Sequence, residues 1–169
     1  MGLADSLGER FIELDDNNRK RVLKKTYHGM LFARYFGQSV GRLYGKMSNE
    51  LQSVIMSQTE RNPQFADGLG MGLGYMYATL KPALQYEIMQ KAQKSFDLSR
   101  GLGFGFGLTF ALLQEEDAEN MMSVADKNSE LDVGFGMGLA VTYSNLPNGL
   151  RKFVLDRACL LYTSDAADE

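Results

Sequence analysis

The chain has almost none of the residues that usually bind metals or carry out thiol chemistry. Its 169 residues include one cysteine, one histidine and no tryptophan. A structural zinc site needs about four ligands, mostly cysteine and histidine, so this class of site is excluded. A single cysteine also cannot form an internal disulfide. We therefore expect the protein to hold no metal and no other cofactor.

The final eleven residues, 159–169, do not resemble the rest of the sequence. The run from Cys159 to Glu169 looks like one reading frame of the transposon-end adapter used to prepare sequencing libraries. Residues of this kind are excluded before the fold is considered. We predict that 159–169 is a disordered, non-native tail and that the natural sequence is interrupted near Ala158.

Charge is balanced once this tail is set aside. The whole chain carries 21 acidic and 18 basic side chains, and three of the acids (Asp165, Asp168 and Glu169) lie in the tail, which leaves 18 of each sign. A neutral chain has no general attraction for nucleic acid or for an anionic membrane surface, so we expect neither as a partner. The N-terminus lacks the pattern of a signal peptide, which predicts a cytoplasmic protein.

The chain does contain a repeat of 33 residues over most of its length. The units begin at Gly29, Asn62, Ser95 and Asn128, each has a glycine eight residues later, and an aromatic residue follows seven positions after that glycine. A fixed period of this length indicates a repeat array whose units cannot bury their apolar faces alone. The sequence predicts one repeat domain, 1–158, with a partial unit at 1–28, full units at 29–61, 62–94 and 95–127, and a truncated unit at 128–158.

Each unit has two halves of different composition. The second half, for example 82–94, is polar with apolar residues at the spacing of one helix face, and Pro82 suits the first turn of a helix. The first half, for example 65–80, is rich in glycine. Glycine alternates with other residues over 68–74, which is typical of a strand, but the unit that begins at Gly29 has the pattern of an amphipathic helix. We predict a helix for both halves of every unit.

Glycines four residues apart have a packing use in such a helix. Gly70 and Gly74 would lie on one side, where the missing side chains let a neighbouring backbone approach closely. Gly68 and Gly72 lie at repeat positions that hold larger residues in another unit; Tyr35, for example, lies 33 residues before Gly68. We therefore expect Gly68 and Gly72 to tolerate alanine better than Gly70.

Two helices in 33 residues resemble the helical-hairpin arrays, such as the tetratricopeptide, ankyrin and HEAT repeats, in general build. The tryptophan of the tetratricopeptide pattern and the Thr-Pro-Leu-His signature of ankyrin are absent, so the resemblance is to an architecture. It implies an all-α fold, a right-handed α-α superhelix or solenoid of about five helical-hairpin repeats.

No catalytic pattern accompanies the repeat. His28 closes the first unit, where a polar helix end is the ordinary explanation, and no serine lies in a nucleophile elbow. The glycines do not form a phosphate-binding motif. The acids Glu115, Glu116, Asp117 and Glu119 lie at the start of a predicted helix, where negative charge suits the helix dipole better than it indicates a metal site. We predict that the protein is not an enzyme.

One side of the first-half helices is apolar where a side that faces solvent would be polar. At 100° per residue, two positions of each unit point away from the packed side, and the equivalent residues of successive units form two columns. These residues are either core between two layers or an apolar groove for a partner helix. The columns hold Gln38, Met71, Phe104 and Met137, and then Arg42, Tyr75, Leu108 and Val141. We predict a scaffolding module that binds a protein or peptide through this face.

A second hypothesis is a membrane-associated or self-assembling structural protein whose glycine-alternating segments are strands. The segments are too short for membrane helices, and the helical second halves argue against this alternative.

The last unit also predicts self-association. Segment 128–158 is as rich in apolar residues as an internal unit, for example at Phe135, Leu139 and Phe153. A terminal repeat normally has a polar outer face. We expect the natural protein to continue with another unit and this chain to associate with itself through the exposed C-terminal face.

Overall fold

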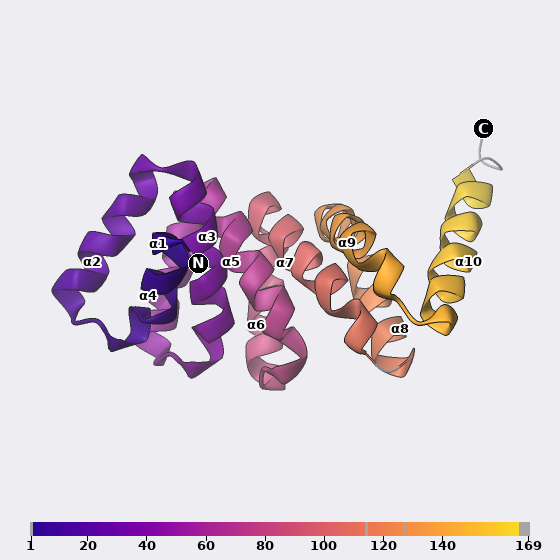
Figure 1. The fold of residues 1–169 in the computed structure, drawn as a ribbon, viewed down its shortest axis with the longest axis horizontal. Helices are drawn as coiled ribbons and strands as arrows, with labels where there is room; N and C mark the ends of the chain where they lie inside the picture. The colour runs from indigo at the N-terminus through magenta and orange to yellow at the C-terminus, as the bar shows by residue number, and fades with distance from the viewer. Residues whose placement is uncertain (1, 114, 127, 166–169) are drawn as a thin grey trace.

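The computed structural model describes residues 2–113, 115–126 and 128–165, and this part of the chain is helical with no β-strand. Figure 1 shows the helices following one another along the molecule. Their bounds are α1 (Leu3–Glu9), α2 (Asp16–Lys25), α3 (Met30–Leu43), α4 (Asn49–Thr59), α5 (Pro63–Met76), α6 (Pro82–Ala92), α7 (Phe96–Thr109), α8 (Glu115–Ala125), α9 (Ser129–Thr142) and α10 (Asn148–Asp165).

The first halves of the units form one layer. Helices α1, α3, α5, α7 and α9 pack side by side in chain order, and α4, α6 and α8 pack against α5, α7 and α9 respectively. The all-helical prediction is confirmed, and the stacking is consistent with a helical repeat. The interpretation of the glycine-alternating segments as strands is wrong, because 68–74 lies inside α5.

The first residue of each 33-residue unit is the N-cap of a helix. Gly29, Asn62, Ser95 and Asn128 are the N-cap residues of α3, α5, α7 and α9. The Asn62 side chain accepts a hydrogen bond from the Phe65 N–H at 3.1 Å, as N-cap residues do. Its amide also donates to the Thr26 carbonyl at 3.0 Å, so the cap ties α5 to the end of the partial unit 1–28.

Glycine alternation in α5 produces two stripes on opposite sides of one helix. Residues two apart in a helix lie about 200° apart, and residues four apart lie about 40° apart. Gly68 and Gly72 therefore form an upstream stripe, which faces α3, and Gly70 and Gly74 form a downstream stripe, which faces α7. A period of two is thus compatible with a helix that has a close neighbour on each side.

Both stripes are in contact with neighbouring backbone. A Cβ atom on Gly72 would overlap the carbonyl oxygen of Gln38 in α3, and one on Gly70 would overlap that of Leu98 in α7. The expectation that Gly72 tolerates alanine better than Gly70 is therefore wrong. It is wrong for Gly68 as well, where a Cβ atom would meet the backbone of α3.

The stripes bring the α-carbons of glycines face to face. An added Cβ atom on Gly72 would lie 2.9 Å from the Cα of Gly41. Each glycine lowers helix propensity by about 1 kcal/mol relative to alanine, and the close van der Waals packing of two backbones offsets this loss. Three glycine pairs make the approach: Gly41 with Gly72, Gly74 with Gly105, and Gly107 with Gly138.

The pattern changes where the neighbour changes. In α3 the upstream positions hold Tyr35 and Ser39, and Ser39 packs against Gly8 of the short α1. Tyr35 is 49% exposed. At the other end of the layer, an added Cβ atom on Gly136 of α9 would have no atom within 4 Å. The larger residues of unit 29–61 therefore occupy places without a full-length neighbouring helix.

The hydrophobic core lies between the layer of first-half helices and the second-half helices. Phe36, Leu69 and Phe106 from the first and Ile55 and Ile88 from the second are each at most 1% exposed. Helix α10 includes residues 159–165, and the disorder predicted for 159–169 stays a prediction. Residues 166–169 lie outside the described residues, and the non-native origin of the segment stays a prediction.

A pair of reciprocal hydrogen bonds closes two of the hairpins. The Tyr44 hydroxyl donates to the Gln52 carbonyl at 3.3 Å, and the Gln52 amide donates to the Tyr44 carbonyl at 2.9 Å. Tyr77 and Gln85 repeat both bonds at 3.3 and 2.8 Å. The pair fixes the turn between the two halves of a unit.

We predict that alanine at either stripe of an internal helix destabilises the protein. Gly70→Ala and Gly72→Ala should each lower the free energy of unfolding by roughly 1–3 kcal/mol, because the new methyl group must push a helix away. Gly136→Ala, in the same column as Gly70, should raise it by about 0.5–1 kcal/mol, because alanine favours the helix and meets nothing. Urea denaturation at low protein concentration measures all three. A Gly72→Ala variant as stable as the parent would refute the two-stripe packing.

Unit 95–127 indicates how the tyrosine–glutamine pair should respond to mutation. It holds Phe110 and Ala118 in these positions, both fully buried, so the hydroxyl and the amide are absent together. Tyr77→Phe and Gln85→Ala should each cost about 1 kcal/mol of stability, since each removes one hydrogen bond to a backbone carbonyl. The double variant should cost less than the sum by about 0.5–1 kcal/mol in a denaturation cycle. Strict additivity would show that the two bonds are not coupled.

Candidate functional site

The eight residues of the predicted face come from four neighbouring helices. Because α3, α5, α7 and α9 stack with a 33-residue offset, each column becomes a row across the layer. We call these residues the open face: Gln38 and Arg42 on α3, Met71 and Tyr75 on α5, Phe104 and Leu108 on α7, and Met137 and Val141 on α9.

The exposure of these side chains bears on the two interpretations of the face, core between two layers or an apolar groove for a partner helix. Met71 is 7% exposed and fits the interpretation as core. Gln38, Phe104 and Leu108 are half-buried and Arg42 is exposed. Tyr75, Met137 and Val141 are 43%, 51% and 63% exposed, so large apolar side chains reach the surface on both α5 and α9. The role of the face in binding stays a prediction.

A contact within one row fixes the surface at its N-terminal end. The guanidinium carbon of Arg42 lies 5.0 Å from the centre of the Tyr75 ring, a distance typical of a cation–π interaction. This contact orients both side chains across the boundary between α3 and α5.

One turn earlier on the same helices lies a charged row that the sequence reasoning missed. Asp67 accepts from Arg34 at 2.8 Å and from Arg100 at 3.3 Å, so one carboxylate of α5 joins α3 to α7. Asp97 also pairs with Arg100, at 2.9 Å. The signal was present in the sequence, since residues 34, 67 and 100 are 33 positions apart and alternate in sign. The Asp67 side chain is 11% exposed, and the pairs that hold it there add ionic contacts between three successive helices of the layer.

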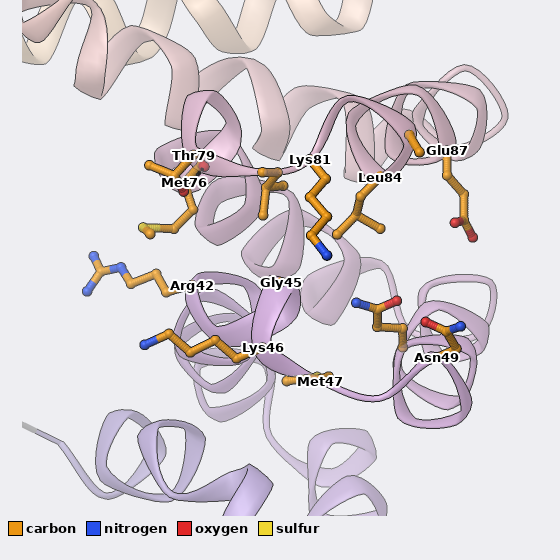
Figure 2. A pocket seen from close by; sticks show the side chains of 13 residues that line it. Arg42, Gly45, Lys46, Met47, Asn49, Met76, Thr79, Lys81, Leu84 and Glu87 are labelled. Atoms are coloured by element: carbon orange, nitrogen blue, oxygen red, sulfur yellow. Dashed lines mark hydrogen bonds between the residues drawn. The ribbon is translucent and has the colours of Figure 1, made fainter.

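A cleft with a positive end opens beside the face. Its volume is about 480 Å³, and it lies between the turn after α3 and the start of α6 (Figure 2). Arg42 and Lys46 extend together toward one end, Lys81 comes from the opposite wall, and Glu87 lies at the other end. Among the described residues, no carboxylate forms an ion pair with any of these three cations. The cleft could therefore accept an anionic side chain.

Tyr44, which forms the reciprocal hydrogen bonds with Gln52, lies near this cleft. Burial raises the pKa of Tyr44 far above its ordinary value, and the negative charge of Glu87 raises it further. The phenol therefore stays protonated and keeps its hydrogen bond to the Gln52 carbonyl. Its role is structural, because it holds the turn that carries Lys46.

The remaining candidate groups contribute no further site. His28 is exposed at the end of a short 3-10 helix, Thr26–His28, as the sequence predicts. The side chains of Glu115, Glu116 and Asp117 lie outside the described residues. Within the described part of the chain, no three His, Cys, Asp or Glu side chains are grouped to hold a metal ion. No described helix is long and apolar enough to cross a membrane.

We predict that the charged row contributes to stability across the layer. Asp67→Asn should lower the free energy of unfolding by about 1 kcal/mol, a modest figure because both arginines are partly solvated. Asp97→Asn is the matched control and should cost only a few tenths, since Asp97 pairs within its own helix. Equal effects in denaturation at low salt would show that Asp67 does not link the helices.

No family model matches the chain, and neither a curated protein nor a solved structure is significantly similar to it.

Proposed function

We propose that the chain is a right-handed solenoid of about five helical hairpins and acts as a non-catalytic scaffolding module that binds a protein or peptide. Four helix caps at one spacing, the repeated tyrosine–glutamine pair and the ordered stack of first-half helices support this architecture. Arrays of this kind commonly use an extended surface along the stack for binding.

The open face is the proposed binding surface. The observation that carries this proposal is the exposure of Tyr75, Met137 and Val141, at 43% to 63%, in columns that would be polar on a purely solvated helix face. Apolar side chains gathered in rows on a surface are typical of sites that bind other proteins. The stack of backbones holds these rows in fixed register, so little ordering of the scaffold is needed on binding.

The charges around the face suit a partner of a particular chemistry. The apolar rows run from α5 to α9, and the positive end of the cleft lies beside them at Arg42, Lys46 and Lys81. A segment that fits both has an apolar stripe for the rows and acidic residues at one end for the cleft. An amphipathic helix supplies this arrangement, with apolar residues at i, i+3, i+4 and i+7.

A peptide library displayed on phage tests the proposal. Sequences enriched on the whole chain should share an apolar helical stripe followed or preceded by acidic residues. For the enriched peptides, synthesised and titrated by fluorescence anisotropy, Tyr75→Glu should raise Kd by about tenfold or more, equivalent to at least about 1.4 kcal/mol.

Tyr86→Glu is the matched control. Tyr86 is an exposed tyrosine of α6, 69% exposed, and lies outside the open face, so this variant should bind the peptides with the parent affinity. Lys81→Glu should also weaken binding of the enriched peptides, because it repels their acidic end. Enriched peptides that bind Tyr75→Glu as tightly as the parent would exclude the open face as the binding surface.

A further inference from the structure

The outer side of α9 is the unpaired half of an interface that the molecule uses three times. In the columns of Gly136, the glycines Gly37, Gly70 and Gly103 are each covered by the backbone of the next first-half helix. At Gly136 an added Cβ atom has no neighbour within 4 Å, and Ala140, one turn later, is exposed. Helix α9 therefore presents a downstream stripe that no described residue covers.

Helix α10 also exposes a surface that the equivalent helices bury. Second-half helices bury the apolar column that holds Ile55, Ile88 and Met121, at most 9% exposed, and α4, α6 and α8 pack against the next first-half helix. Val154 continues that column and is only half-buried, and Leu155 beside it is 51% exposed. Two helices at this end thus expose the surfaces that contact a following first-half helix elsewhere.

The other end of the chain carries the complementary surface. Helix α1 packs on α3 through Gly8, and its outer side holds Gly2 and Ser6 in the columns of the upstream stripe. An added Cβ atom on Gly2 would meet only its own Asp5, and Ser6 is exposed. Leu3, which occupies a core column of the repeat, is 69% exposed.

We propose that the α9 and α10 end of one copy binds α1 of a second copy, so that the stack of first-half helices continues from chain to chain. The contact extends an interface already present between α3, α5, α7 and α9, with small residues facing small residues. It is heterologous, since different surfaces meet, and therefore builds open rows of copies and not a closed dimer.

The junction is weaker than the internal interfaces. Helix α1 has 7 residues, whereas α3, α5, α7 and α9 have 14 each, so about half of the contact is available. Ser6 and Ala140 also stand where the internal interfaces mostly have glycine, which keeps the backbones farther apart. Association at micromolar or higher concentration follows from such a small interface.

Sedimentation velocity of the full chain tests the proposal, from about 1 to about 100 µM, the range expected for a small interface. The mass of the parent should rise continuously with concentration. Gly136→Glu blocks the α9 side and Ser6→Glu blocks the α1 side, and each variant alone should stay monomeric. Both positions are exposed, so the folded structure should be kept, which circular dichroism checks.

An equimolar mixture of the two blocked variants decides the geometry. One intact α9 side and one intact α1 side remain, so the mixture should form a 1:1 heterodimer and nothing larger. Tyr86→Glu, away from both ends, should associate like the parent. A parent chain that is monomeric throughout, or a Ser6→Glu variant that still dimerises through paired α9 helices, would overturn the proposal.

Discussion

The structure depends on the direct approach of helix backbones at glycine. Gly41 and Gly72, Gly74 and Gly105, and Gly107 and Gly138 stand opposite one another across three successive interfaces. No side chain separates the helices there, so the spacing of the layer is set by the main chain itself. Since interior packing is dense and responds to a single added methyl group, this spacing leaves little freedom for the register of the rows on the surface.

Much of the fold could be predicted from the sequence because the same helix signals recur in every unit. The period located the starts of the units from Gly29 to Asn128, which are N-caps in the structure, and the helical spacing in 82–94 predicted α6. The alternation over 68–74 was harder, since a period of two is also the strand signal. Only the arrangement in space explains it, because the helix has close neighbours on two opposite sides. For the same reason Gly72 could not be distinguished as a packing residue from sequence alone.

The candidate surface was predictable in its columns and less so in its chemistry. Helix geometry identified the eight residues, but the burial of Met71 and the exposure of Val141 depend on how neighbouring helices overlap. The pairing of Asp67 with Arg34 and Arg100 was readable in the 33-residue spacing. The cleft at Lys46 and Lys81 was not, because these residues occupy different columns and meet only across a hairpin boundary.

The most direct test of this account is a nuclear Overhauser spectrum that resolves the glycine α-protons. Backbones in contact at two stripes require cross-peaks between the α-protons of Gly41 and Gly72, of Gly74 and Gly105, and of Gly107 and Gly138. We expect all three, together with helical sequential patterns through 68–74. A folded protein in which these α-protons show no contact between helices, or in which 68–74 gives strand patterns, would contradict the packing on which the rest of the structure depends.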